Sequence, residues 1–285
     1  MKIAYLGPEA SFTHHAVKKA FPKDDLVPFA TIPDCLEALT AMQVDRAVVP
    51  LENALEGSVP ITVDYLFHDV DVYITAELVS PIEQHLMVHP VNESRWEEVT
   101  KIMSHSHALA QCHKYLYYRF RGRILEPSTS TAAAAHYVNE HPEENVAAIG
   151  NSLAAKTYGL KIVEENIHDF HFNHTRFVVL SCTAATDHLE LTGASHKSTL
   201  MVTLPSDDRA GALHQVLSAF SWRQLSLSKI ESRPLKTGLG NYFFIIDVEQ
   251  SMDGVLMRGA IDELEALGCT VKVLGSYQKH SVPTL

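Results

Sequence analysis

Five adjacent residues bring together side chains that could do chemistry: Asn173, His174, Thr175, Arg176 and Phe177. They stand at the polar start of an apolar run, which predicts that they open a β-strand. Because side chains alternate along a strand, Thr175 and Phe177 share one face and Arg176 lies on the other, unless the strand start is twisted. A hydroxyl, an imidazole and a guanidinium so close in sequence suit a site that binds and converts a small carboxylate.

A second group of polar residues stands where predicted strands give way to predicted helices. In parallel α/β sheets such junctions gather at the carboxyl ends of the strands, where ligands usually bind. Their backbone N–H groups and the positive helix ends can hold an anion without any net positive charge. Taken singly, each residue is better explained as an ordinary helix cap, but together they favour a shared site. The group comprises Ser11, Thr13, Ser58, Ser104, Ser106, Ser130, Thr131 and Ser152.

Two further segments place amides near these junctions. Segment 50–59 is expected to form a loop between a strand and a helix, in which Glu52, Asn53, Glu56, Gly57 and Ser58 either orient a polar substrate or are simply solvated. Segment 104–112 places Ser104 before a helix and Gln111 about two turns into it. Ser104 and Gln111 can face one cleft only if the start of that helix lines it.

The elements that must position these residues alternate between short apolar runs and helical patterns, which is typical of parallel α/β units. The result would be one α/β assembly over residues 1–182. Strands are predicted at 3–6, 26–29, 47–50, 72–79 and 85–89, and helices at 12–21, 34–42 and 60–67.

Beyond Ser181 the periodicity stops, and residues 183–197 are rich in Ser, Thr, Ala and Gly, which predicts a linker. Residues 198–277 then follow a βαββαβ order, which predicts a small ferredoxin-like domain. Its strands are expected at 199–204, 227–233, 242–248 and 270–274, and its helices at 211–222 and 256–267.

Glycines and a proline mark the turns of this second domain. Gly268 should end its second helix in a left-handed conformation, and Gly238 and Gly240 should form the turn between its central strands. Gly211 is expected to let backbones approach closely at a helix start, and Pro234 to end strand pairing. Taken alone, the domain is predicted to serve dimerisation or ligand sensing.

Charge and composition exclude several classes of protein. The chain carries 23 Lys and Arg against 34 Asp and Glu, and its net charge of −11 argues against nucleic acid or an anionic membrane as the main partner. The apolar run at the N-terminus is too short for a signal peptide, and no run approaches the roughly 20 residues of a membrane span. We therefore expect a cytoplasmic protein in which local groups hold any anionic ligand.

Neither the cysteines nor the histidines indicate a metal site. Cys35, Cys112, Cys182 and Cys269 are far apart, which also argues against a disulfide framework. The chain has 17 histidines, but none stands in an HExxH arrangement. No metal is expected.

Taken together, these segments resemble the prephenate dehydratase family along nearly the whole chain. The resemblance rests on GPEASFTHHA near the start, PLENALEGSV at 50–59, SHSHALAQC at 104–112, STSTAAA at 128–134 and NIHDFHFNHTRF at 166–177. The C-terminal part resembles the family's ACT domain through GALH at 211–214 and ESRP at 231–234. Several strings in this order are far more specific than any one of them.

The resemblance implies a catalytic domain of two α/β lobes, similar to periplasmic binding proteins, with the active site between them. It implies that prephenate loses its ring carboxylate as CO2 and its hydroxyl as water, which gives phenylpyruvate without a metal or an organic cofactor. Thr175 would be the catalytic hydrogen-bond donor to the leaving hydroxyl. The substrate-binding residues would be Asn53, Ser104, Gln111, Arg176 and Phe177.

The same resemblance implies that the ACT domain binds L-phenylalanine as a feedback inhibitor, commonly between subunits, in a homodimer or homotetramer. The chain departs from the family at Ala54, Ala210 and Ser226, where Ser, Pro and Asn are common. The last two leave the affinity for the effector open. The effector-binding residues would be Gly211, Ala212, Leu213, Ser226, Glu231, Ser232 and Arg233.

Two alternatives share most of these features. A related enzyme could use arogenate and release phenylalanine itself, and a non-enzymatic sensor could close the same lobes on a small anion. A sensor has no need of the Thr-Arg-Phe sequence at 175–177, which favours an enzyme.

Overall fold

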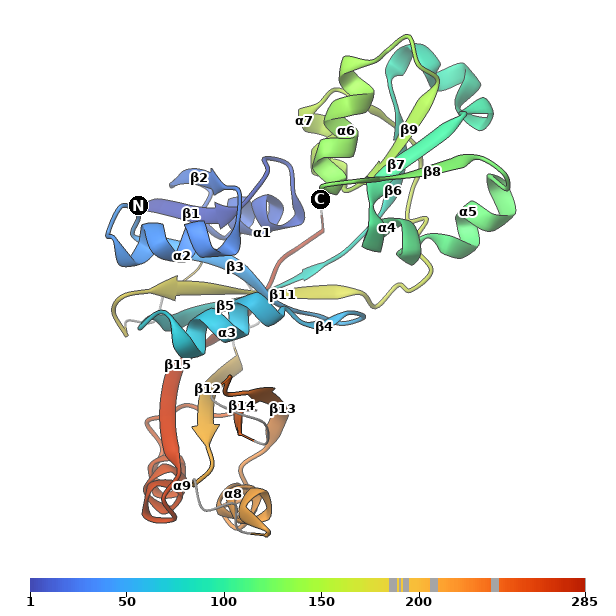
Figure 1. Ribbon diagram of the computed structural model, residues 1–285. Helices are drawn as coiled ribbons and strands as arrows, with labels where there is room; N and C mark the ends of the chain where they lie inside the picture. The colour runs from blue at the N-terminus through green and yellow to red at the C-terminus, as the bar shows by residue number, and fades with distance from the viewer. Residues whose placement is uncertain (185–188, 190, 192–194, 206–209, 237–240, 285) are drawn as a thin grey trace. The chain divides into compact units, whose positions relative to one another are not determined.

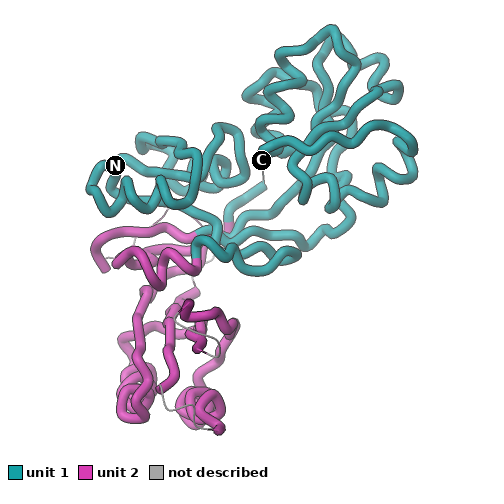
Figure 2. Tube along the Cα trace, viewed as in Figure 1, with its two compact units in different colours: residues 1–62, 79–177, 282–285 teal, residues 63–78, 178–281 magenta. Residues whose placement is uncertain are grey.

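The computed structural model describes residues 1–184, 189, 191, 195–205, 210–236 and 241–284. The predicted turn residues Gly238 and Gly240 lie outside them. The chain divides into two compact units, the first of residues 1–62, 79–177 and 282–285 and the second of residues 63–78 and 178–281 (Figure 2). The functional domains 1–182 and 198–277 and the linker 183–197 stay a prediction.

The first unit opens with parallel strands joined by helices, as the sequence predicts (Figure 1). Strand β1 (Lys2–Leu6) pairs with β2 (Asp25–Phe29) and β3 (Arg46–Asn53), and α1 (Phe12–Ala20) and α2 (Ile32–Thr40) connect them. Ser11 accepts a hydrogen bond from the N–H of His14 and so caps α1, as a Ser at a helix start does for about 1 kcal/mol.

Strand β3 is longer than the sequence indicates. It continues to Asn53 and turns into β4 (Gly57–Ser58), with Asn53 paired to Gly57, whose φ is +80°. The expected loop around Glu52 and Asn53 is therefore wrong: both residues are in the strand, and only 54–56 form the turn. The hairpin fixes the position of the Asn53 side chain more firmly than a loop would.

A second sheet in this unit has the order β10-β6-β9-β7-β8. Strand β7 pairs in parallel with β8 and β9, whereas β6 is antiparallel to β9 and β10, so this sheet is mixed rather than purely parallel. Both faces are covered, because Ala148 belongs to one apolar cluster and Ala147 and Ile149 to another. The strands are β6 (His85–Val88), β7 (Lys101–His105), β8 (Ile124–Ser128), β9 (Val146–Gly150) and β10 (Lys161–Glu164).

Helices and one further strand complete the elements near the site. The helices are α3 (Pro60–His68), α4 (Ser106–Gln111), α5 (His113–Arg119), α6 (Thr131–Glu140) and α7 (Ser152–Thr157), and the 3₁₀ segment η1 spans Pro90–Glu98. Strand β5 is Tyr73–Pro81, and β11 is His174–Ser181, whose start at the polar residues is as predicted. Within the described residues, no helix has both the length and the apolar character needed to cross a membrane.

The second unit contains the predicted βαββαβ order. Its elements are β12 (Ser195–Thr203), α8 (Ala212–Ser221), β13 (Leu227–Pro234), β14 (Tyr242–Val248), α9 (Val255–Ala266) and β15 (Thr270–Ser281). Two bounds differ from the prediction by more than one residue, since β12 begins at Ser195 within the expected linker and β15 runs seven residues past Leu274. Residues 63–78 of α3 and β5 also belong to this unit, where Glu77 forms a buried ion pair with Lys197 at 3.2 Å.

Gly268 and Gly211 both lie at helix ends, as predicted, but the predicted reason for a glycine holds only at Gly268. Gly268 follows α9 with a φ of +87°, as a left-handed cap requires. Gly211 precedes α8 with a φ of +88°, and an added Cβ there would meet nothing within 4 Å. The expected close backbone approach at Gly211 is therefore wrong, and its positive φ is the reason that glycine suits this position.

A buried histidine in α1 makes the stability of the first unit depend on pH. His15 is 5% exposed, and its Nε2 has no hydrogen-bond partner among the described groups. Burial, with smaller contributions from Lys19 and His14, lowers the pKa of His15 to about 4. The unfolded chain therefore binds a proton more readily, so this stability is present above about pH 6.5 and is lost as the pH falls towards 4.

Replacing His15 with leucine should therefore make the protein less sensitive to acid. Between pH 6.5 and pH 4 the wild-type free energy of unfolding should fall by ~3 kcal/mol more than that of His15→Leu, because the variant has no imidazole to protonate. Urea unfolding of the wild type and of His15→Leu at pH 6.5 and pH 4 measures the fall in each free energy of unfolding. Equal losses in the two proteins would refute this assignment.

Candidate active site

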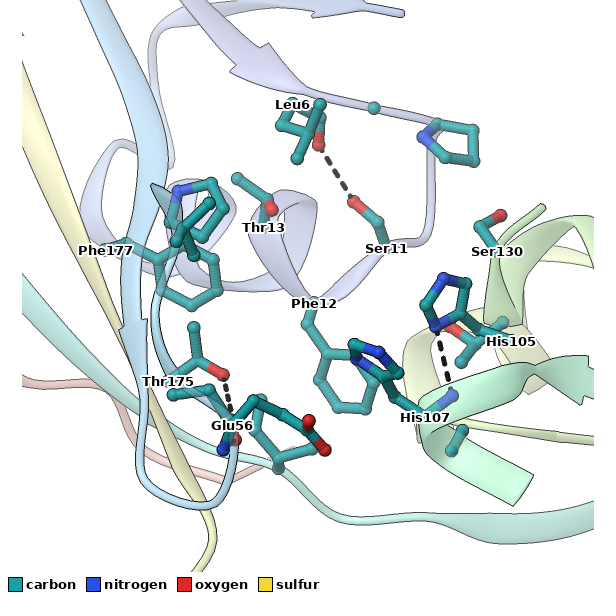
Figure 3. Close-up of a pocket in the computed structure, with 18 of the residues that line it drawn as sticks. Leu6, Ser11, Phe12, Thr13, Glu56, His105, His107, Ser130, Thr175 and Phe177 are labelled. Carbon is teal, nitrogen blue, oxygen red and sulfur yellow. Dashed lines mark hydrogen bonds between the residues drawn. The ribbon is translucent and has the colours of Figure 1, made fainter. Parts of the chain in front are cut away.

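A cavity of about 1070 Å³ lies in the first unit and is lined by residues of the loops around both its sheets (Figure 3). It brings together most of the residues that the sequence singles out. Those in its lining are Ser11, Thr13, Asn53, Ser58, Gln111, Ser130, Thr131, Thr175 and Phe177. The predicted convergence of strand-to-helix junctions is thus seen for five of the eight Ser and Thr residues, and not for Ser104, Ser106 or Ser152.

Thr175 and Asn53 form the most closely coupled pair in the lining. Asn53 Nδ2 donates to Thr175 Oγ1 at 2.9 Å and to Asn173 Oδ1 at 2.9 Å. Asn53 Oδ1 accepts the backbone N–H groups of Leu55 at 3.0 Å and Glu56 at 3.1 Å. Because backbone N–H groups can only donate, these two bonds fix which end of the amide faces Thr175.

The direction of this bond has a chemical consequence. Thr175 Oγ1 accepts from Asn53, so its own proton is available to donate to another group. The Thr175 side chain points into the cavity, as does Phe177 two residues further along the same strand face (Figure 3). The cavity therefore contains a hydroxyl that is held by a neighbour and set to act as a donor.

Arg176 lies on the opposite face of β11, as alternation predicts. Its Nη1 is 3.4 Å from Glu52 Oε2, its side chain is 9% exposed, and it is not part of the cavity lining. Arg176 is therefore not positioned to make the predicted contact with a substrate in this cavity. His174 is exposed and likewise outside the lining, with Nδ1 3.0 Å from the carbonyl oxygen of Phe172.

Ser104 does not reach the cavity either. It precedes α4, as predicted, but it is the fourth residue of β7, and its fully buried Oγ donates to the carbonyl oxygen of Ile149 at 2.7 Å. That bond uses the single hydroxyl proton to join β7 to β9. Gln111, by contrast, is at the end of α4 and lines the cavity.

Gln84 is a member of the lining that sequence reasoning missed. Its Nε2 donates to Gln111 Oε1 at 3.4 Å, which leaves the Nε2 group of Gln111 as the donor end for a ligand. Gln84 Oε1 is buried without a hydrogen-bond partner among the described groups. A ligand with a donor could satisfy that oxygen, because a buried acceptor without a partner is costly.

Two helices begin at the cavity, so their N-terminal ends, which carry partial positive charge, lie at its wall. Ser11 caps α1 and Ser130 caps α6, whose Ala133 N–H donates to Ser130 Oγ at 2.9 Å. Both residues line the cavity, together with Thr13 and Thr131 (Figure 3). Because unpaired N–H groups and the helix dipole favour anions at such positions, these helix starts suit carboxylate groups.

Four titratable side chains also line the cavity: Glu56, which the sequence offers as one that could orient a substrate, and Glu9, His105 and His107, which it does not single out. Burial lowers the pKa of His105, repulsion by His107 lowers it further, and Glu56 opposes both. The sequence signal for the two histidines is the SHSH string at 104–107, which has no metal-ligand spacing. Among the described residues, no group of three or more His, Cys, Asp or Glu side chains could hold a metal ion.

The fold and the cavity together define an α/β protein with a binding site for a small molecule. The model of the prephenate dehydratase family matches residues 3–185, which is more than half of the chain. The chain belongs to the prephenate dehydratase family.

Individual relatives agree over the full length. The chain is 55% identical to a prephenate dehydratase of Bacillus subtilis (strain 168), covering 99% of this chain and 100% of the relative. It is 42% identical to a prephenate dehydratase of Lactococcus lactis subsp. cremoris (strain MG1363), covering 99% of each. A solved structure of prephenate dehydratase from Arthrobacter aurescens in complex with L-Phe is similar with a TM-score of 0.85 and 31% identity, covering 97% of this chain and 90% of that one.

Proposed function

We propose that the chain converts prephenate to phenylpyruvate, CO2 and water, and that Thr175 assists the departure of the hydroxyl. The observation that carries the proposal is the Thr175 hydroxyl, held by Asn53 so that its proton faces a cavity in a chain of this family. The electron pair of the breaking carbon–carboxylate bond enters the ring, the hydroxide leaves with one added proton, and the ring becomes aromatic. The products are a phenylpyruvate anion, CO2 and water.

The role of Thr175 follows from its chemistry. An alcohol is a poor acid near neutral pH, so Thr175 acts as a hydrogen-bond donor whose interaction strengthens as charge develops on the leaving oxygen. Asn53 holds the hydroxyl in this orientation, Gln111 offers its Nε2 group to a substrate oxygen, and Phe177 adds an apolar wall. Arg176 contributes by its ion pair with Glu52, which ties β11 to β3, and Ser104 by joining two strands.

Architecture and setting form part of the same proposal. The two sheets of the first unit correspond to two periplasmic-binding-like lobes, and residues 198–277 to an ACT domain. The protein acts in the cytoplasm as a homodimer or homotetramer. An enzyme that prefers arogenate would have the same cavity, and a sensor would bind prephenate without converting it, so product analysis distinguishes the three functions.

Feedback regulation by L-phenylalanine is supported by the Arthrobacter aurescens relative, whose structure contains L-Phe. The candidate contacts lie in the second unit, where Arg233 forms an ion pair with Asp64 at 3.0 Å and Glu231 with Lys229 at 3.1 Å. An amino acid ligand carries both charges, so it can exchange with such pairs. The other candidates are Gly211, Ala212, Leu213, Ser226 and Ser232.

Adding L-phenylalanine should both slow turnover and raise the melting temperature. A ligand at about 100 times its Kd stabilises the folded state by ~2.7 kcal/mol, which corresponds to a shift of several degrees. Thermal unfolding and initial rates with L-phenylalanine are compared with the same measurements in D-phenylalanine. If L-phenylalanine changes neither quantity, the protein does not sense it.

A further inference from the structure

The cavity lacks a fixed positive charge. None of its described lining residues is Lys or Arg, although prephenate carries two carboxylates, and Glu9 and Glu56 add negative charge. The lining side chains that can take up a proton to become cationic are His105 and His107. Recognition of the anion must therefore come from these histidines and from the starts of α1 and α6.

The position of the histidines matches the shape of the substrate. In prephenate the hydroxyl and the carboxylate-bearing carbon are on opposite corners of the ring, so the carboxylates lie far from the hydroxyl. Figure 3 shows Thr175 and Glu56 on one side of the cavity, and His105, His107 and Ser130 on the other. A substrate whose hydroxyl meets Thr175 thus directs its carboxylates towards the histidines.

The rings of His105 and His107 differ in hydrogen bonding and in exposure. The backbone N–H of His107 donates to His105 Nδ1 at 3.4 Å, so neutral His105 carries its proton on Nε2 and can donate there. Burial lowers the pKa of His105, which disfavours its charged form. His107 is exposed, with its ring 5.0 Å from that of His105, and its side chain lines the cavity.

We propose that His107, with His105 beside it, binds the pyruvyl carboxylate of the substrate. This inference rests on the proposed function. It also explains why the cavity has no arginine: a fixed cation on the ring carboxylate would stabilise the ground state more than the transition state, in which that charge departs with CO2.

The test uses three variants and two readouts. His107→Ala should raise KM about tenfold, because a hydrogen bond to a charged carboxylate is lost. His107→Arg should keep KM close to that of the wild type, because its guanidinium still offers donors to the carboxylate. His136→Ala, at an exposed residue of α6 outside the cavity, is the matched control and should follow the wild type.

Titrating prephenate into Thr175→Ala protein, with and without each His107 substitution, gives the same comparison without turnover. If His107→Ala binds prephenate like its parent, the inference is wrong. If the wild type fails to convert prephenate, the proposed function is wrong, and the binding titrations still decide the role of His107.

Discussion

Replacing Thr175 with alanine is expected to lower kcat by about 10²–10³-fold while leaving the fold intact. The loss has this size because one preorganised donor to a developing oxyanion typically contributes that much to the rate. The removed hydroxyl accepts from Asn53 in the folded protein, but Asn53 retains Asn173 Oδ1 as an acceptor at 2.9 Å. Stability should therefore change little, and kcat at saturating prephenate together with the melting temperature measures both effects.

Thr175→Ser is the matched control, because it keeps the hydroxyl and removes only the methyl group. It should retain most of the activity that Thr175→Ala loses. A Thr175→Ala protein that turns over prephenate at close to the wild-type rate would show that another group assists the leaving hydroxyl.

Replacing Asn53 with aspartate should lower kcat on the order of 10²-fold, which is close to the loss expected for Thr175→Ala, although the two side chains have nearly the same shape. The new carboxylate can still accept the N–H groups of Leu55 and Glu56, but it has no proton to give to Thr175. Thr175 would then donate its proton to the carboxylate instead of to the substrate. The hydroxyl would remain in place but with the wrong orientation.

A double variant makes this prediction specific. If Asn53 acts on the rate through Thr175, Asn53→Asp combined with Thr175→Ala should have a kcat close to that of Thr175→Ala alone, because residues that act as a unit are not additive. If the loss of kcat in the double variant equals the product of the two single losses, Asn53 acts independently of Thr175. Asn166→Asp, at an exposed residue outside the cavity, controls for the added charge and should keep the wild-type kcat.

The sequence predicts the strand that carries Thr175 well, because strand alternation is a local property. The polar start of an apolar run located β11, and a period of two separated Thr175 and Phe177 from Arg176. The structure then shows what alternation leaves open. The strand start is not bent enough for Arg176 to share the cavity, and the guanidinium pairs with Glu52 instead.

Other parts of the site depend on contacts that a sequence does not contain. Ser104 and Ser130 look alike as hydroxyl residues near helix starts, yet Ser104 is used by a strand partner 45 residues away and Ser130 caps a helix at the cavity. The histidines at 105 and 107 form no metal-ligand spacing, so the sequence pattern alone does not mark them as site residues. Their place in the lining follows from where α4 packs.

The most direct test of the central claim is product analysis of the purified wild-type protein with prephenate and, separately, with arogenate. Prephenate should be converted to phenylpyruvate with release of one CO2 for each product, and Thr175→Ala should abolish most of this turnover under the same conditions. Binding of prephenate without formation of phenylpyruvate, or conversion of arogenate alone, would contradict that claim.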